Sequence, residues 1–321
     1  MTEARQPGII NVRGEPADGQ IMNLHFSNSE TIFNIHTDGI PYLSVDLLDR
    51  LGVPNLYSTR FLSYEAEHGR GTQGLRVVVM NGEDLEEAAP VVFGNRDRLA
   101  RQMGASIRQE CVTDQMHTNH VYLVRPEDLG PILRQDKPKE RRSVDGVITD
   151  LPGAVLTAFG GDCPPVYLAD PVRRAIGLVH AGWRGTLGRI PAVAIQRMRE
   201  EFGSAAEDLY AAIGPGICQE CYEMGEEVRE QFADQWGEPA AERIFRRFPA
   251  FAKDGSEIPG GKFHLDLMEA NRMTLLAAGV RPERIAVSNV CTKCNADVFY
   301  SYRAHRMENE QAAMLVNRWD L

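Results

Sequence analysis

The stretch LTAFGGDCPPVYLADPVRRAIGLVHAGWRGTLGRI, residues 156–190, alternates short apolar runs with tight turns. Apolar runs of this length, bounded by Gly, Pro and Asp, predict buried strands, which we expect at residues 155–159, 166–168 and 176–179. Cys163 follows the first of these runs and His180 ends the third. We therefore expect both side chains at strand ends, where a substrate or a metal ion can reach them.

The flanking sequence continues this pattern in both directions. Apolar runs predict further strands at residues 75–80, 144–148, 210–214, 285–290 and 297–302, and helical periodicity predicts helices at residues 41–51, 191–202, 223–236 and 267–278. No internal repeat and no linker divides the chain. The sequence thus predicts an α/β fold, a single mixed domain with β-sheets flanked by helices over residues 21–321. Residues 1–20, rich in Gly, Pro and charge, are expected to be a flexible leader.

Composition and charge limit the classes of partner. The chain has 321 residues, 43% of them hydrophobic and 25% charged, with a formal net charge of -10. Its basic residues cluster only in the short run 137–142, which we expect to be a solvated loop, so a nucleic acid is not the expected partner. No apolar run is long enough to cross a bilayer, and the N-terminus has no signal-peptide pattern. We expect a cytoplasmic protein with a small substrate, no membrane partner, and cysteines that are reduced, metal-bound or buried.

The residues around Cys163 and His180 are suited to holding a metal ligand or a nucleophile in place. Two prolines directly after Cys163 fix an extended turn, which preorganises the thiol. Two glycines after His180 let the backbone approach a bound group closely, and Arg184 between them supplies a charge that can support an anion. Asp162 precedes the thiol. The stretch therefore fits either a zinc ligand set or a Cys/His nucleophilic pair.

A further pair of imidazoles lies upstream, in QMHTNHV at residues 115–121. His117 and His120 are three positions apart and precede a strand-like run. Residues three apart in a strand point to opposite faces, so we expect only one of the two to face a given site.

Six motifs of this chain resemble, in order and approximate spacing, those of the YfiH/YlmD-like proteins, whose older label was laccase or polyphenol oxidase. They are QMHTNHV, DGVITDLPGAVLTAFGGDCPPVYLAD, VHAGWRG, AAIGPGI, HLDLMEANR and VCTKCNADVFYSYR. The resemblance implies a YfiH-like fold and a zinc-dependent purine nucleoside phosphorylase that also deaminates adenosine and phosphorolyses methylthioadenosine. Its implied substrates are purine nucleosides and phosphate.

The resemblance also implies a set of site residues. The zinc-binding catalytic triad of the family falls on His117, Cys163 and His180, and its phosphate-facing arginine falls on Arg60, in LYSTR. Our hypothesis adds Asp162 and Arg184 as support on the substrate side. The chain departs from the family after Arg60, where FLSYEAEHGRGTQG replaces a glycine-rich loop, and at residues 308–311, where ENEQ stands.

The chemistry of these ligands can be stated without the family. Two imidazoles and one thiolate make a three-ligand zinc site with a position left open, as catalytic zinc requires. Zinc lowers the pKa of water to about 7, which suits attack on C6 of adenosine.

Three alternatives use other residues or other chemistry. CQEC at 218–221 and CTKC at 291–294 could form a structural four-cysteine zinc site in a non-catalytic protein, although the gap between them is far longer than the ~15–20 residues of zinc ribbons. A metal-free Cys/His hydrolase would use Cys163 and His180. Copper oxidation of phenols needs many clustered histidines, and the eight of this chain are scattered.

Overall fold

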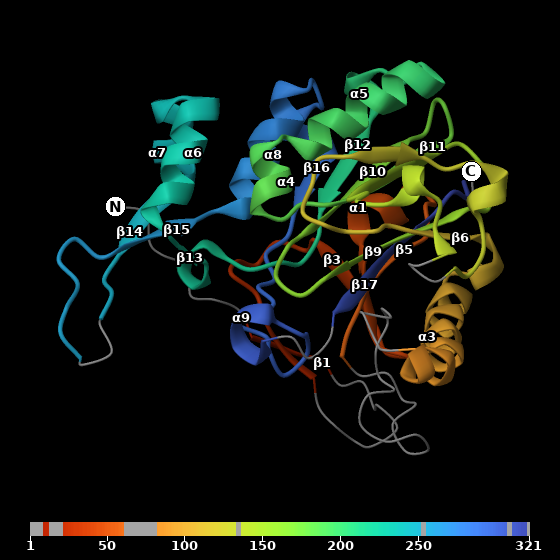
Figure 1. The fold of residues 1–321 in the computed structure, drawn as a ribbon, viewed down its shortest axis with the longest axis horizontal. Helices are drawn as coiled ribbons and strands as arrows, with labels where there is room; N and C mark the ends of the chain where they lie inside the picture. Colours follow the sequence, from red (N-terminus) through yellow and green to blue (C-terminus); the bar gives the residue numbers. More distant parts are fainter. Residues whose placement is uncertain are drawn as a thin grey trace.

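Two six-stranded β-sheets lie face to face in the structure (Figure 1). It is a computed structural model that describes residues 9–12, 22–60, 82–132, 136–251, 255–306 and 310–319. The predicted strand at residues 75–80 and the departures from the family at residues 61–74 and 308–309 lie outside the described residues.

The first sheet contains the strands that carry Cys163 and His180 at their ends. Its strand order is β16-β12-β10-β11-β8-β7. The β12–β16 and β7–β8 pairs are parallel and the other pairs are antiparallel. The strands are β7 (Val121–Leu123), β8 (Gly146–Thr149), β10 (Pro165–Asp170), β11 (Ala175–His180), β12 (Tyr210–Ile213) and β16 (Ile285–Val287).

The second sheet has the order β3-β4-β5-β17-β9-β6, with β6 parallel to β9 and the other neighbours antiparallel. It joins N-terminal strands to the last strand of the chain, because β17 lies between β5 and β9. The strands are β3 (Phe33–His36), β4 (Tyr42–Val45), β5 (Asn55–Ser58), β6 (Glu110–Val112), β9 (Val155–Gly160) and β17 (Gln311–Val316).

The hydrophobic core is layered. One cluster fills the space between the sheets, with Tyr167 and Leu178 of the first facing Tyr57 and Leu156 of the second. The Tyr167 hydroxyl also donates to the Leu56 carbonyl at 3.0 Å, a direct bond from sheet to sheet. A second cluster joins the outer face of the first sheet to α5 (Ile190–Phe202) and α8 (Leu267–Ala277), and a third joins the second sheet to α3 (Gly82–Gln102). The order of layers is therefore helix, sheet, sheet, helix.

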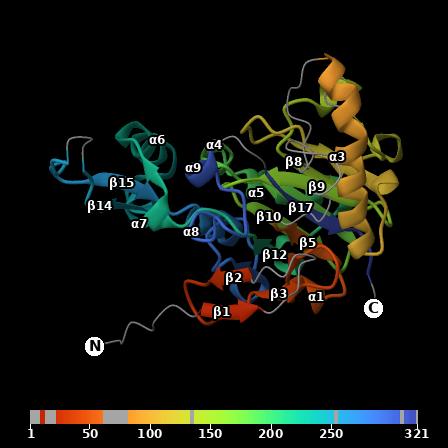
Figure 2. The same ribbon diagram turned by 90° about the horizontal axis from the view of Figure 1, so that it is seen from below.

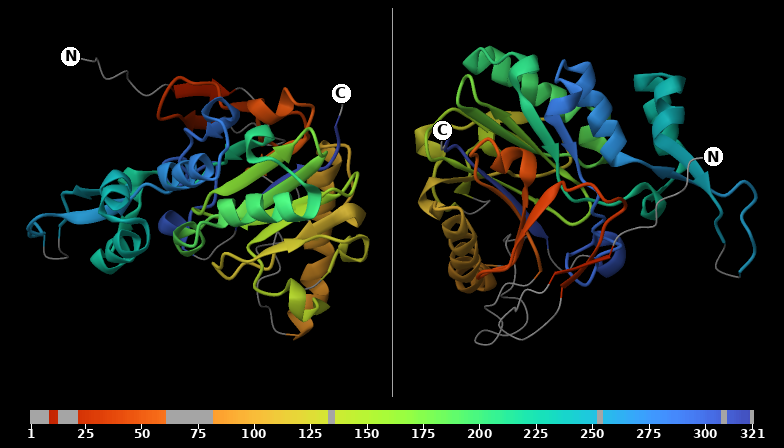
Figure 3. Two further views of the ribbon diagram at one scale, coloured as in Figure 1. Left: turned by 90° about the horizontal axis from the view of Figure 1, so that it is seen from above. Right: turned by 180° about the vertical axis from the view of Figure 1, so that it is seen from behind.

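A smaller lobe lies to one side of these layers (Figures 2 and 3). Its three-stranded sheet has the order β13-β15-β14 and packs with two helices around a separate cluster that includes Phe232, Phe245 and Leu265. The lobe consists of β13 (Glu223–Met224), α6 (Glu226–Trp236), α7 (Glu238–Ile244), β14 (Phe245–Phe248) and β15 (Lys262–Leu265). The other α-helices and β-strands of the described residues are β1 (Ile9–Val12), β2 (Met22–His25), α1 (Asp46–Asp49), α4 (Trp183–Leu187) and α9 (Tyr302–His305).

The strongest sequence signals are confirmed. Each predicted strand between residues 155 and 179 is observed, as are the helices α5 and α8. The Asp266 side chain accepts from the Glu269 N–H at 2.9 Å and caps α8, while Gly279 follows the helix with φ 100°. The mixed α/β domain is thus as expected, and no helix among the described residues has the length and apolarity to cross a bilayer.

Several local predictions were wrong. The helix predicted at residues 41–51 begins only at Asp46, because Tyr42–Val45 is a fully buried strand paired with β3 and β5. Glu223–Met224 is a strand instead of the start of a helix, and residues 297–301 form turns before α9, with no strand. The boundary between a leader and the domain at residue 21 stays a prediction; within residues 1–20, the described segment Ile9–Val12 forms β1 and pairs with β2.

The basic run at residues 137–142 is not a simple solvated loop. Lys137 and Arg141 are buried, and the Lys137 ammonium donates to the carbonyls of Val112 and Thr113. Burial lowers the pKa of Lys137 to about 8. The run therefore anchors the end of β6.

Candidate metal centre

Three residues expected to act together do meet in space. The ligand atoms of His117, Cys163 and His180 all lie within 4.8 Å of one another. The two imidazole rings have centroids 5.0 Å apart and meet edge to face at 76°. This Cys/His group can hold a metal ion.

Strand pairing brings the thiol to His180. β10 and β11 are antiparallel, and His180 at the end of β11 is paired with Pro165 at the start of β10. The turn that carries Cys163 therefore lies beside the end of β11, and the Ala181 N–H donates to the Pro164 carbonyl at 3.0 Å to close it. His180 is only 4% exposed, so solvent has little access to this side of the site.

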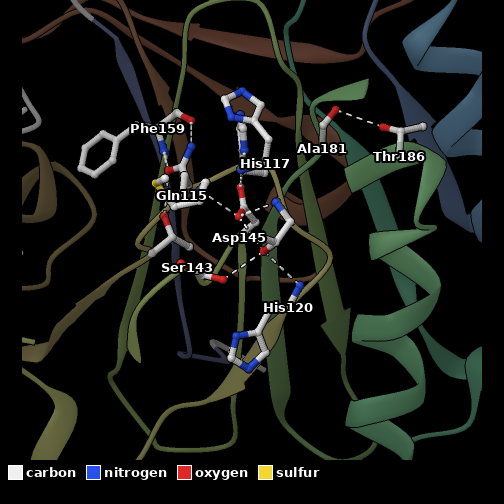
Figure 4. A network of polar contacts seen from close by, with 12 residues as sticks. Gln115, His117, His120, Ser143, Asp145, Phe159, Ala181 and Thr186 are labelled. Atoms are coloured by element: carbon white, nitrogen blue, oxygen red, sulfur yellow. Dashed lines mark hydrogen bonds and ion pairs between the residues drawn. The ribbon is translucent and has the colours of Figure 1, made fainter. Parts of the chain in front are cut away.

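Asp145, directly before β8, organises the other side (Figure 4). Its carboxylate is 0% exposed and accepts from His180 Nδ1 at 2.9 Å, which leaves Nε2 as the ring nitrogen that can bind a metal. The same carboxylate accepts the three successive backbone N–H groups of Met116, His117 and Thr118 at 2.9–3.0 Å, and the Thr118 hydroxyl at 2.8 Å. One side chain thus fixes both histidines.

This set of bonds holds His117 in an unusual conformation. Its φ is 61°, in the left-handed region, where a non-glycine residue costs roughly 1–2 kcal/mol. The bonds to Asp145 offset that cost and hold the exposed imidazole over the cluster. His120 lies on the opposite side of Asp145, as Figure 4 shows, and is not a member of the group. The reason given for this from the sequence was wrong, because neither histidine lies in a strand: β7 begins at Val121.

The charges of the three groups support one another. Burial disfavours charged His180, but the Cys163 thiolate and Asp145 raise the pKa of the imidazole to about 10. Burial likewise disfavours a thiolate, yet His180 and His117 lower the pKa of Cys163 to about 7. For Asp145, the bond from His180 outweighs burial and lowers the carboxyl pKa to about 2. The site therefore favours a thiolate, and a bound cation would take over the role of the imidazolium proton.

Gly182 is needed for a close approach. A Cβ at this position would lie 2.9 Å from Cys163 Sγ and 2.9 Å from His117 Cδ2. A side chain would therefore push into two of the three ligands, although φ of Gly182 is −67° and demands no glycine.

Of the other predicted site residues, Asp162 is buried and Arg184 is exposed. The Asp162 carboxylate accepts from the hydroxyls of Thr292 and Ser301 and from the Arg303 N–H at 2.7–2.8 Å. These bonds turn Asp162 toward the C-terminal segment and suit a role in positioning the Cys163 turn. Arg184 is exposed, with its guanidinium 4.1 Å from the centre of the Trp183 ring.

Arg60 is held by the same C-terminal segment. Its Nη1 donates to the Ala296 carbonyl at 2.9 Å, its backbone N–H donates to the Val298 carbonyl at 2.9 Å, and its guanidinium lies 5.3 Å from the centre of the Tyr300 ring.

Sequence reasoning missed Asp145 and Gln115. Gln115 bonds both backbone groups of Phe159 in β9 and so ties the His117 loop to the strand that leads to Cys163. The one available signal for Asp145 was its place directly before the apolar run GVIT, a position where a buried carboxylate can cap a loop.

Known proteins are similar to this chain in both sequence and fold. A family model described as "Multi-copper polyphenol oxidoreductase laccase" matches residues 78–317. The chain belongs to this family. Among solved structures, it is similar to the YfiH protein of Bacillus licheniformis, with a TM-score of 0.70 and 25% identity over 88% of this chain and 98% of that one. The YfiH-like fold and the resemblance drawn from the motifs are thereby confirmed.

Two relatives in the YfiH family carry names that describe an activity. A protein of Deinococcus radiodurans named "Purine nucleoside phosphorylase" is 35% identical over 266 residues, which is 83% of this chain and 88% of the relative. "Adenosine deaminase RL5", from an unidentified prokaryote, is 34% identical over 212 residues, which is 66% of this chain and 76% of the relative. This family therefore includes proteins named for two reactions of purine nucleosides.

Proposed function

We propose that the protein is a zinc-dependent purine nucleoside phosphorylase that also deaminates adenosine and phosphorolyses methylthioadenosine. One observation carries the proposal: His117, Cys163 and His180 converge within 4.8 Å, with His180 oriented by a buried carboxylate. The names of the relatives indicate the substrate class, purine nucleosides with phosphate. The expected compartment remains the cytoplasm.

The donor set fits zinc. Two imidazoles and a thiolate are a three-ligand set of the catalytic type, and an imidazole that bonds a carboxylate through its second nitrogen is the usual support of such a ligand. The thiolate form of Cys163, favoured by the two histidines, is the form that binds metal. Zinc in this place would supply Lewis-acid chemistry toward water or phosphate.

The residues of the chain then have separate tasks. Asp145 fixes the tautomer of His180 and the loop of His117, so that both imidazoles keep their orientation through the reaction. Burial of His180 strengthens electrostatic interactions on its side of the site. His117 is exposed, and substrate enters from its side.

Phosphorolysis forms a C1′–O bond to phosphate and breaks the C1′–N bond to the purine, which leaves with a proton. The chain must therefore hold a phosphate anion beside the ribose. We assign this task to Arg60, with Arg184 as a second cation and Asp162 positioning the Cys163 turn. Arg60 is half-buried and held by bonds to the C-terminal segment, which suits a fixed anion contact.

One observation favours a second candidate function, the metal-free hydrolase. Asp145, His180 and Cys163 stand in the order of a carboxylate, a base and a nucleophile. A nucleophilic triad, however, has no use for a second imidazole at the thiol, whereas a metal site has. Alkylation of Cys163 with and without a chelator separates the two: protection by bound zinc supports the metal site.

The direct test is product analysis. Purified, zinc-loaded protein is incubated with adenosine, inosine, guanosine or methylthioadenosine, with and without phosphate. We expect the free base and a pentose 1-phosphate only with phosphate, and inosine from adenosine in either case. Absence of all these products would refute the proposal. Equal turnover under anaerobic conditions is expected, whereas phenol oxidation that requires copper and oxygen would support the older label.

A further inference from the structure

A second group of possible metal ligands comes from two segments that are far apart in the sequence. Cys218, Cys221, Cys291 and Cys294 form two CxxC pairs, and their four sulfur atoms lie within 4.8 Å of one another. All four are free of disulfide bonds. None of them belongs to the Cys/His group, so the cluster is a second, separate group of ligands.

Parallel strand pairing explains how the two pairs meet. β12 and β16 are parallel neighbours, so the chain leaves both strands at the same edge of the sheet. Cys218 follows β12 and Cys291 follows β16. The pairing continues beyond the strands through a bridge between Gly216 and Cys291, with the Thr292 N–H donating to the Gly216 carbonyl at 3.0 Å. The two CxxC pairs are therefore close in space although they are far apart in the sequence.

The separation of the sulfur atoms fits a metal better than a disulfide. Four thiolates at about 2.3 Å from one tetrahedral zinc ion lie about 3.8 Å from each other. Cys221 Sγ and Cys294 Sγ are 3.6 Å apart, close to that value. A disulfide would require about 2.05 Å.

Backbone groups also point at the sulfurs. The N–H groups of Cys218 and Cys294 both donate to Cys291 Sγ, at 3.3 and 3.4 Å. Two N–H donors on one sulfur suit a thiolate, which accepts hydrogen bonds better than a thiol. The turn after Cys291 is closed by the Asn295 N–H, which donates to the Cys291 carbonyl at 3.1 Å. The Cys221 N–H likewise donates to the Cys218 carbonyl at 3.1 Å, so a backbone hydrogen bond closes each CxxC turn.

We propose that Cys218, Cys221, Cys291 and Cys294 bind a structural zinc ion in a closed, four-thiolate site. Tetrahedral coordination by four sulfurs is characteristic of structural zinc, and it leaves no position open for substrate. This zinc holds the small lobe to the first sheet, because the Cys218–Cys221 turn leads directly into β13.

The site also supports the candidate metal centre. The Ile217 N–H donates to the Asp162 carbonyl at 2.8 Å, and the Thr292 hydroxyl donates to the Asp162 carboxylate at 2.8 Å. Each of these residues is adjacent to a proposed zinc ligand, and Asp162 is adjacent to Cys163. Four-thiolate zinc therefore fixes both segments that hold the Cys163 turn.

The test compares the zinc content of the full-length wild type with that of the Cys221→Ser/Cys294→Ser double variant. We expect the double variant to lose one zinc ion per chain relative to wild type. Cys111→Ser, at a buried cysteine outside both clusters, is the matched control and should lose none. Equal zinc in wild type and double variant would overturn the proposal. The same comparison in a Cys163→Ser background, which removes a ligand of the Cys/His group, should again show the loss of one zinc ion and so assigns that ion to the cysteine cluster.

Two measurements on the wild type keep the proposal testable if the double variant does not fold. Alkylation of Cys221 and Cys294, followed by peptide mass spectrometry, should be slow in the purified protein and become fast after a chelator is added. Equal rates with and without chelator would overturn the proposal. So would an intact mass, under non-reducing conditions, that shows disulfides among the four cysteines, or iron bound in place of zinc.

Discussion

The two ligand clusters of this protein differ in number, type and support. The Cys/His group has three ligands, one exposed and one buried, and its geometry depends on the side chain of Asp145. The cysteine cluster has four ligands of one kind, supplied by two short turns whose own backbone N–H groups bond the sulfur. An open set with external support suits reaction at a metal, whereas a closed set with local support suits a structural metal.

The comparison also shows how the clusters are coupled. They share no ligand, yet Asp162 touches the segments of the second cluster through Thr292 and Ile217 and carries Cys163 of the first. A substitution in the Cys/His group should leave the cysteine cluster intact. A substitution in the cysteine cluster should weaken the support of the turn that carries Cys163. Each variant below tests one part of this asymmetry.

The largest effect is expected for Cys163→Ser. It removes the only thiolate of the open set, and a serine hydroxyl is a poor zinc ligand, so activity should fall to background and one zinc ion per chain should be lost. The zinc of the cysteine cluster should remain. Metal content and phosphorolysis, compared with Cys111→Ser as control, measure both effects, and retained activity would rule out a required thiolate.

Gly182→Ala should come next. The new Cβ would stand 2.9 Å from Cys163 Sγ and from His117 Cδ2, so the open set must spread. A displacement of this kind can lower kcat/KM by about 100-fold. Gly94→Ala is the control, because a Cβ there meets nothing within 4 Å, and it should leave activity unchanged. Steady-state kinetics measure kcat/KM of the two variants, and equal values would contradict the predicted clash.

Asp145→Asn should weaken zinc binding at the open set, or its activity, by about 10- to 100-fold, the usual effect of removing the support of a histidine ligand. The amide cannot accept all the bonds that the carboxylate accepts from His180 and the His117 loop. Competition with a chromogenic chelator measures the change. An unchanged zinc affinity would show that the carboxylate does not tune the ligands.

The smallest effect is expected for Thr292→Val, which removes the hydroxyl bond between the two clusters. The loss of a buried hydrogen bond to a charged group costs about 1.5–3 kcal/mol of stability. Denaturant unfolding measures this cost, and zinc content should stay at the wild-type level. A loss of zinc from the open set would mean that coupling is stronger than the structure indicates.

The sequence predicted the strands around Cys163 and His180 because their apolar runs are short and bounded by Pro and Gly. It failed at residues 41–51, where the leucine spacing fits a helix but Tyr42–Val45 is captured between β3 and β5, a tertiary effect. Cys163 and His180 were singled out from the turns that carry them, and the family resemblance joined them to His117 as a set of three ligands. Asp145 was missed because its role depends on where a distant loop folds, and the meeting of the CxxC pairs depends on parallel pairing of β12 with β16.

The most direct test of the central claim is His117→Ala. His117 is a ligand in a metal centre but has no part in a triad of Asp145, His180 and Cys163. Zinc per chain and pentose 1-phosphate formed from adenosine and phosphate are measured in the same preparations of wild type and variant. We predict that the variant loses one zinc ion and its phosphorolysis together. A variant that keeps both its zinc and its phosphorolysis would contradict the account.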